Sequence, residues 1–219
     1  MNLFLIKWIL VKHIYLCYDE IKKETCERKI LVMKLIIKNK VESVQKIKEL
    51  KLNTFPEALF KKGEESKVLE FVEKYPAEYY AIRDKSSVGG VFKLKVKKEN
   101  ILDEIKEYEL FTINVSSINY AENQIMEADI EIKRNGDIYI TISKSVDENV
   151  RDNIESAYMS LKTDIFDNKT LSKIPDFDYI YSYLYENNLF DCLVEFSLFD
   201  KPVGINNERI IIWELRTHY

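Results

Sequence analysis

The chain has 219 residues, of which 46% are hydrophobic and 32% charged, and its formal net charge is −4. This composition excludes both a membrane-type and a disordered chain, and the length allows one substantial core or two small subdomains. The sequence pI of about 5.5 argues against nucleic acid as the partner, because phosphate binding needs a concentrated basic surface.

Few residues are suited to soft-metal or nucleophilic chemistry. The three cysteines, Cys17, Cys26 and Cys192, match no zinc-binding spacing and indicate a reducing compartment, so we expect a cytoplasmic protein. The two histidines, His13 and His218, are too few for a histidine-based metal site or a Ser-His-Asp triad. Any metal ion should therefore be a hard one on oxygen ligands.

The first apolar run, Leu3–Tyr18, is interrupted by two lysines and a histidine. It is too short and too polar to span a bilayer, and we expect no membrane partner. No small-residue cleavage site follows it. We interpret residues 1–32 as an N-terminal extension, either an appended helix or strand or a segment upstream of the functional start. Met33 is an alternative start, because the patterned chain begins just after it.

Two helices are predicted next. Residues 41–52 carry apolar side chains at helical spacing with charges between them, which is typical of an amphipathic helix. Residues 66–75 predict a second helix, with Ser66 as its N-cap and Pro76 as its stop.

A hairpin with a basic face follows. Residues 79–83 and 91–96 alternate as strands, and the polar loop 84–90 turns one into the other. In the second strand the alternation predicts two faces, an apolar one with Phe92, Leu94 and Val96 and a basic one with Lys93, Lys95 and Lys97.

The central part of the chain predicts further short elements. They are a helix at 100–108, a strand at 110–115, and a hairpin that joins 125–132 to 137–142. Asn135-Gly136 between the last two strands is a strong hairpin signal. Residues 147–189 are expected to be mainly helical.

The end of the chain predicts a hairpin that brings two carboxylates together. Residues 194–199 and 210–216 are apolar runs separated by a turn rich in Gly, Pro and Asn. If the turn is symmetric about Gly204-Ile205, Glu195 lies opposite Glu214, and Arg216 shares their face. Two carboxylates on one face repel unless a cation offsets their charge, and a bound Mg²⁺ would do so. The alternative is a solvated outer face with a surface ion pair between Glu214 and Arg216.

The predicted order of elements indicates an α+β fold with mostly antiparallel sheets and flanking helices. We expect two lobes after the N-terminal extension. The first comprises residues 33–122 and contains the glycine loop, and the second comprises residues 123–219 and contains the carboxylate hairpin.

The loop between the first two strands has the composition of a phosphate site. Its glycines allow backbone N–H groups to approach an anion without a Cβ in the way. The residues that we expect the hairpin to bring close together are Arg83, Lys85, Ser86, Ser87, Gly89, Gly90, Lys93 and Lys95. The alternative is a tight hairpin tip with solvated lysines.

These motifs resemble the ATP-grasp superfamily over roughly residues 41–219. Residues 79–93 look like its basic strand, Ser/Gly loop and return strand, which hold the nucleotide phosphates, and the variant with an arginine in the strand is similar to the nucleotide-binding part of phosphoenolpyruvate synthases. Residues 123–127, with Gln124, resemble the linker strand that holds adenine. The helix at 174–188 that leads to Glu195 looks like the helix before the first metal-binding strand.

The strand with Glu214 resembles the second metal-binding strand, where the family has Glu-x-Asn and this chain has Glu-x-Arg. The resemblance implies ATP and Mg²⁺ as cofactors, with Glu195 and Glu214 as metal ligands, and Arg83 and Arg216 as catalytic residues. Arg216 departs from the family pattern, although an arginine can contact the γ-phosphate in place of a second ion.

The function implied by the resemblance is ATP/Mg-dependent phosphoryl transfer to an unknown small-molecule acceptor. Activation of a carboxylate for ligation is favoured, and phosphorylation of a hydroxyl by a kinase is the alternative reaction. Such a reaction needs positioning and charge neutralisation, so it requires neither a catalytic histidine nor a catalytic cysteine. The alternative, favoured by Arg216, is a module that senses a nucleotide or an anion without turnover.

A third reading is a protein-interaction role on a degenerate grasp scaffold, with a protein partner or a homo-oligomer. Four tyrosines at odd positions cannot share one helical face, so some of them must be exposed: Tyr179, Tyr181, Tyr183 and Tyr185.

Overall fold

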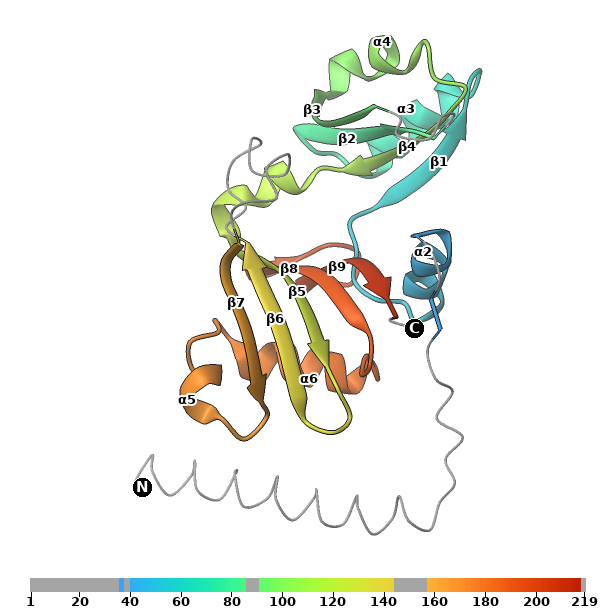
Figure 1. Cartoon of the computed structure of the whole chain (residues 1–219). Helices are drawn as coiled ribbons and strands as arrows, with labels where there is room; N and C mark the ends of the chain where they lie inside the picture. The colour runs from blue at the N-terminus through green and yellow to red at the C-terminus, as the bar shows by residue number, and fades with distance from the viewer. Residues whose placement is uncertain (1–35, 38–39, 86–90, 144–156, 218–219) are drawn as a thin grey trace. The chain divides into compact units, whose positions relative to one another are not determined.

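The computed structural model describes residues 36–217, except 38–39, 86–90 and 144–156 (Figure 1). The described residues belong to one compact unit, Ile36–Tyr219. The expectations for residues 1–32, the start at Met33 and the polar tip of the first hairpin lie outside the described residues. Within the described ranges, no helix is long and apolar enough to cross a membrane.

A four-stranded antiparallel sheet, in the order β1-β4-β2-β3, forms from residues 57–115. Its elements in chain order are β1 (Glu57–Lys61), α3 (Glu65–Lys74), β2 (Tyr79–Asp84), β3 (Phe92–Lys97), η1 (Lys98–Asn100), α4 (Ile101–Ile105) and β4 (Leu110–Val115). Figure 1 shows both α-helices beside this sheet. Apolar residues of the helices and of alternate strand positions are buried in a common core, so one sheet face is covered.

The predicted faces of β3 are wrong at its start. Tyr80 pairs with Val96, but Ile82 pairs with Lys93, because β3 has one extra residue between these pairs. Such a bulge reverses the side-chain alternation beyond it. Lys93 therefore shares the buried face with Ile82, while Phe92 shares the open face with Arg83.

The predicted helices are present with shifted ends. The helix at 41–52 is α2 (Lys40–Glu49), and α4 is shorter than the predicted 100–108. The N-cap of α3 is Glu64 rather than Ser66, which lies in the first turn. The helix ends at Lys74, as Pro76 predicts.

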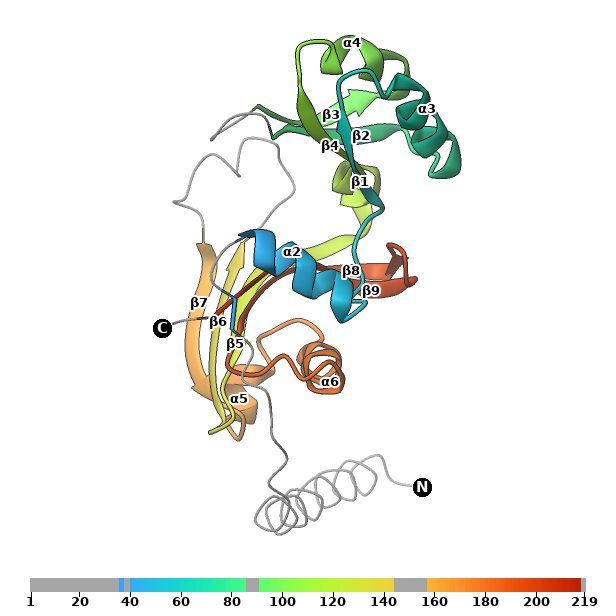
Figure 2. The same ribbon diagram turned by 90° about the vertical axis from the view of Figure 1, so that its right-hand side faces the viewer.

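A five-stranded antiparallel sheet, in the order β7-β6-β5-β8-β9, follows the short helix η2 (Ser117–Asn123). Its elements are β5 (Gln124–Ile132), β6 (Asp137–Ser143), β7 (Ala157–Asp164), α5 (Asn168–Leu171), α6 (Phe177–Glu186), β8 (Leu193–Val203) and β9 (Glu208–Arg216). The hairpin across Gly136 is confirmed, with φ +99° at this residue. Figure 2 shows α6 on one side of the sheet. The α+β class with mostly antiparallel sheets and flanking helices is confirmed, whereas the boundary between 122 and 123 stays a prediction.

The expectation that residues 147–189 are mainly helical is wrong for β7. This strand pairs with β6 along its length, with Leu161 opposite Ile140 and Met159 opposite Ile142. The exposed Ser160 and Lys162 alternate with less exposed neighbours. Period-2 burial on one face of the sheet thus decides the conformation of this segment.

The outer edge of β9 is covered by α2 and the segment that follows it. The backbone N–H of Leu215 donates to the Oγ of buried Ser43 over 2.8 Å. The N–H of Ile212 donates to the carbonyl of Asn53 over 2.9 Å. An edge strand normally presents unpaired backbone groups, so these bonds close the edge.

Asn53 also fixes the connection between β8 and β9. Its Nδ2 donates to three carbonyl oxygens, those of Val203 (2.9 Å), Glu208 (3.2 Å) and Ile210 (2.8 Å). Its Oδ1 accepts from the backbone N–H of Asn206 over 2.8 Å. Because Asn53 is fully buried, these bonds satisfy side-chain polar atoms of Asn53 that have no access to water.

The predicted exposure of some α6 tyrosines is confirmed. Tyr183 is buried, and its hydroxyl accepts from the N–H of Asn53. Tyr185 is 52% exposed and stacks on Tyr181, with 6.3 Å between ring centroids. The role of these rings in contacts with another chain stays a prediction.

Candidate functional site

Three carboxylates form a row across adjacent strands of the five-stranded sheet. Glu195 of β8 pairs directly with Glu214 of β9, as predicted, and Asp129 of β5 pairs with Glu195 on the other side. Directly paired residues point to the same face. Their neighbours Ile130, Val194 and Leu215 are fully buried, so the carboxylates lie on the opposite face from this apolar core. We call Asp129, Glu195 and Glu214 the acidic row.

The pairing of Glu195 with Glu214 arises in a different way from the predicted one. At the connection Val203 pairs with Glu208, so the turn is not centred on Gly204-Ile205. Register shifts farther along β8 and β9 then bring the two glutamates opposite each other. The predicted partners are right, but the predicted symmetry of the turn is wrong.

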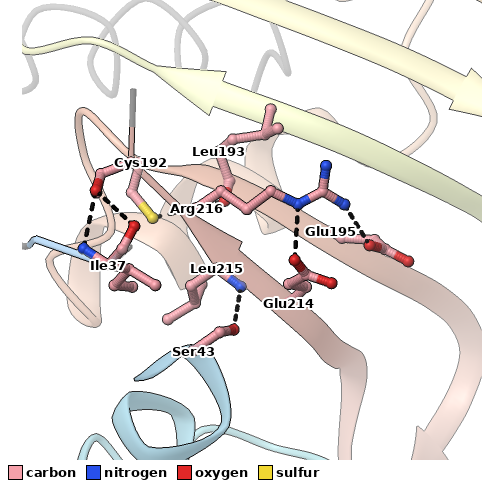
Figure 3. Close-up of polar contacts among 9 residues, drawn as sticks. Ile37, Ser43, Cys192, Leu193, Glu195, Glu214, Leu215 and Arg216 are labelled. Carbon is pink, nitrogen blue, oxygen red and sulfur yellow. Dashed lines mark hydrogen bonds and ion pairs between the residues drawn. The ribbon is translucent and has the colours of Figure 1, made fainter. Parts of the chain in front are cut away.

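Arg216 binds both glutamates of the hairpin (Figure 3). Its Nε donates to Oε1 of Glu214 over 2.9 Å, and its Nη2 donates to Oε2 of Glu195 over 3.0 Å. The side chains are 14% exposed for Glu214, 30% for Glu195 and 48% for Arg216. The ion pair between Glu214 and Arg216 that was the alternative prediction is therefore present, with an exposed arginine and less exposed glutamates.

Burial and mutual repulsion shape the electrostatics of the acidic row. Burial, followed by the charges of Asp129 and Glu214, raises the pKa of Glu195, while Arg216 opposes the rise. Burial also raises the pKa of Asp129, again against Arg216. For Arg216 burial lowers the pKa, but Glu214 and Glu195 outweigh it and the pKa is raised. Among the described residues, the guanidinium of Arg216 is the cation that binds Glu195 and Glu214 and opposes the rise in the pKa of Asp129.

The residues of the acidic row do not fit a magnesium ion. Mg²⁺ needs several oxygen ligands in near-octahedral geometry. In the described ranges, no three Asp, Glu, Cys or His residues come together so that they could hold a metal ion. One oxygen of Glu195 and one of Glu214 already accept from Arg216. The metal-ligand roles of these two glutamates stay predictions, and the geometry disagrees with them.

Arg83 lies on the open face of the four-stranded sheet. It pairs with Thr112 of β4 and Phe92 of β3, and its guanidinium carbon lies 4.4 Å from the centroid of the Phe92 ring. Within the described part of the chain, no ion pair joins Arg83 to a carboxylate. A guanidinium that stacks on a ring keeps its N–H donors available for an anion.

The structure does not bring Lys93 together with Arg83. Because of the bulge in β3, Lys93 lies on the other face, where its ammonium forms an ion pair with Glu104 of α4. Lys85 follows β2 directly and is exposed, and its backbone N–H donates to the carbonyl of Leu110 over 2.7 Å. The remaining predicted phosphate-binding residues lie outside the described residues: Ser86, Ser87, Gly89 and Gly90.

Gln124 is the first residue of β5 and pairs with Phe199 of β8. Its Nε2 is buried and has no hydrogen-bond partner among the described residues. A buried donor without an acceptor costs about 1–3 kcal/mol. This unsatisfied donor occurs in the residue for which the sequence predicts a contact with adenine, and it fits a ligand that supplies an acceptor.

Two residues of these sites, Asp129 and Phe92, were not predicted from the sequence. Glu127, Asp129 and Glu131 alternate with apolar residues in the sequence, which marks one polar face of β5. Only the pairing of β5 with β8 shows that Asp129 adjoins Glu195. Phe92 was missed because the bulge that turns it toward Arg83 leaves no sequence signal.

No protein-family model matches the chain, and no curated protein matches it in sequence. Among solved structures, it is similar to the macrocyclase MdnC of Microcystis aeruginosa bound with its precursor peptide, with 17% identity and a TM-score of 0.43 over 81% of this chain and 51% of that one. It is also similar to D-alanine-D-alanine ligase of Helicobacter pylori, with 14% identity and a TM-score of 0.42 over 81% and 53%.

A further similar structure is N5-carboxyaminoimidazole synthetase of Staphylococcus aureus complexed with ADP, with 10% identity and a TM-score of 0.44 over 81% of this chain and 44% of that one. The chain therefore spans about half the length of the solved structures that it matches. These matched structures are ATP-grasp proteins, the family that the sequence motifs resemble.

Proposed function

We propose that this chain is an ATP-binding module of ATP-grasp type. The observation that carries the proposal is the buried Nε2 of Gln124, which has no acceptor among the described residues. A ring nitrogen of adenine is an acceptor that would satisfy it. Arg83, stacked on Phe92, supplies a cation for the phosphates, and Lys85 leads into the loop whose glycines suit phosphate binding.

The reaction that such binding would serve is phosphoryl transfer to a carboxylate. A carboxylate oxygen of the acceptor attacks the γ-phosphorus, the bond from this phosphorus to the bridging oxygen breaks, and ADP leaves with the electron pair. The products are an acylphosphate and ADP. Positioning and neutralisation of phosphate charge supply most of the rate in such reactions. In this chain the fixed cations for that purpose are Arg83 and Arg216.

A second candidate function is nucleotide binding without turnover. The observation that favours it is the engagement of Arg216 by both Glu195 and Glu214. A guanidinium with two carboxylate partners has less charge to offer a phosphate group than an unpaired one. ATP binding is common to both functions, and only turnover separates them.

The first experiment is calorimetric titration of the full chain with ATP. We expect binding by the wild type, and an affinity about tenfold weaker in Gln124→Ala, because the lost hydrogen bond is worth about 1.4 kcal/mol. Arg83→Gln should weaken binding by a similar factor. Gln45→Ala and Arg134→Gln change exposed residues of the same types and serve as controls with wild-type affinity.

The outcome that would overturn the proposal is an absence of ATP binding by the folded wild-type chain at millimolar nucleotide. If ATP binds, release of ADP is then measured with a panel of small carboxylates, with and without an amine acceptor. Carboxylate-dependent ADP release would support the ligase reaction. Binding without any ADP release would support the second candidate.

A further inference from the structure

The carboxylates of the acidic row repel one another, and a cation between them would reduce this repulsion. Asp129, Glu195 and Glu214 lie side by side on paired strands, and the side chains of the two glutamates are mostly shielded from water. Like charges at such positions destabilise the ionised forms. The same hairpin supplies such a cation, because Arg216 follows Glu214 by two residues and shares its face.

The guanidinium of Arg216 is placed as a bridge between the two strands. Its Nε reaches Glu214 on its own strand, and its Nη2 reaches Glu195 on the neighbouring strand (Figure 3). The fork of an arginine is planar and keeps its charge at every physiological pH. A lysine in this position would offer a point charge instead of two fixed donors.

A divalent cation would compete for the same oxygens. Mg²⁺ and Mn²⁺ bind carboxylate oxygens at short distances and need them free of other strong donors. Here one oxygen of each glutamate is held by Arg216. A divalent ion between the two carboxylates would also lie against the guanidinium charge, which repels it.

From this geometry we infer that Arg216 is a built-in cation that takes the place of a divalent ion between Glu195 and Glu214. The hairpin thus needs no metal ion, and replacing Arg216 with a neutral oxygen-bearing side chain converts it into a divalent-cation site. That the wild-type hairpin binds no divalent ion follows from its own geometry. That ATP would then bind equally well with and without Mg²⁺ rests in addition on the proposed function.

The test is Mn²⁺ binding to the full chain, followed by electron paramagnetic resonance, without nucleotide. We expect the wild type to leave Mn²⁺ free at concentrations at which Arg216→Asn binds one ion per chain, at least tenfold more tightly. Arg216→Lys, which keeps the charge, should behave as the wild type. The double variant Glu195→Gln/Arg216→Asn should lose the acquired site, because it removes one of the carboxylates.

A matched control is Arg134→Asn. Arg134 is also an exposed arginine paired with a carboxylate, that of Asp191, but it does not belong to the acidic row, and its replacement should create no Mn²⁺ site. Circular dichroism establishes that each variant is folded. Should Arg216→Asn not fold, Arg216→Gln replaces it, and Glu195→Gln/Glu214→Gln tests whether any Mn²⁺ bound by the wild type uses these carboxylates.

Two results would overturn the inference. One is tight Mn²⁺ binding by the wild type that is lost in Glu195→Gln/Glu214→Gln, and the other is a folded Arg216→Asn chain with no gain in Mn²⁺ affinity. The consequence for the nucleotide is tested separately, since ATP affinity of the wild type should be equal in EDTA and in Mg²⁺. A chain that binds no ATP would contradict the proposed function but leave the Mn²⁺ result decisive.

Discussion

At the scale of single residues, Gly204 has no room for a side chain. It lies in the connection of the β8–β9 hairpin, which carries two residues of the acidic row. Its φ is +77°, and a Cβ would lie 2.5 Å from Oδ1 of Asn53, 2.6 Å from Cδ1 of Ile211 and 2.8 Å from the carbonyl oxygen of Thr54. Two of these atoms are in groups that cannot easily move, since Asn53 is tied by its hydrogen bonds and Thr54 contributes backbone.

We therefore predict that Gly204→Ala lowers the free energy of unfolding by about 3–5 kcal/mol. Gly63→Ala is the matched control, because Gly63 also has a positive φ of +87° but nothing within 4 Å of a new Cβ. The control should cost only the left-handed strain, about 1–2 kcal/mol. Urea unfolding followed by circular dichroism measures both. Equal losses in the two variants would contradict the steric explanation.

Among the site residues, the glutamate pair and Arg216 could be predicted from the sequence because a hairpin is a local structure. The turn residues and the two apolar runs predict which residues of the two strands pair, and the predicted centre of the turn is only slightly wrong. Asp129 could not be predicted in this way, since β5 and β8 are far apart in the chain and their register depends on the finished sheet. The burial that raises the pKa of Asp129 is likewise a property of that sheet.

At the scale of elements, the closure of the β9 edge by α2 gives a second prediction. Ser43→Ala removes the acceptor of the Leu215 N–H, and an unsatisfied buried donor costs about 1–3 kcal/mol. Ser66→Ala is the control, because Ser66 is exposed in α3 and both changes share the same gain in helix propensity. Urea unfolding should show a loss of stability in the first variant only.

Hydrogen exchange adds a local readout to this prediction. The amide of Leu215 should exchange faster in Ser43→Ala, whereas amides of β5 in the centre of the sheet should keep their wild-type rates. Unchanged exchange at Leu215 would mean that the hydroxyl of Ser43 is not what protects the edge.

The elements that the sequence predicts well are those with strong local signals. The strand at 110–115 has the predicted ends, and Asn135-Gly136 marks the β5–β6 hairpin. The predictions are wrong where tertiary contacts determine the conformation of a segment or the face on which a side chain lies. β7 is a strand because it adds to the edge of β6, and Lys93 is on the covered face because of a bulge in β3. Ser66 has the residue type of an N-cap, yet the chain begins α3 at Glu65.

At the scale of the whole molecule, buried carboxyl groups determine how stability depends on pH. Burial is the largest cause of a raised pKa for Asp129, Glu195 and Glu208. A carboxyl group with a raised folded pKa takes up its proton more readily in the native state, so acidification stabilises the fold between the folded value and the ordinary value of about 4. Above that window the ionised groups destabilise the fold.

Groups of the opposite kind act at lower pH. Hydrogen bonds from neighbouring side chains lower the pKa of Glu49, Glu64 and Asp167. Their stabilising contribution is present above the ordinary value and is lost as pH falls through their lowered folded values. We expect a maximum of stability on the acidic side of neutrality as a result.

Glu208→Gln tests this prediction at a site away from the acidic row. Burial raises the pKa of Glu208 by more than its hydrogen bond with Tyr183 lowers it, and its buried Oε2 lacks a partner among the described residues. The neutral replacement should therefore be more stable than the wild type at pH 7. The rise in stability on acidification from pH 7 toward the ordinary carboxyl pKa of about 4 should become smaller, because one titrating group is gone. Exposed Glu122→Gln is the control. An identical pH profile of Glu208→Gln and the wild type would exclude Glu208 as a contributor.

The bonds of Asn53 also bear on the order in which the protein is made and folded. The three carbonyls that accept from its Nδ2 lie 150 to 157 residues farther along the chain. Contacts of such long range form late, because closing the intervening loop is entropically costly. During translation, the loop that follows α2 can form these hydrogen bonds only after the β8–β9 hairpin has left the ribosome. Until then Asn53 and the neighbouring apolar residues remain accessible to chaperones.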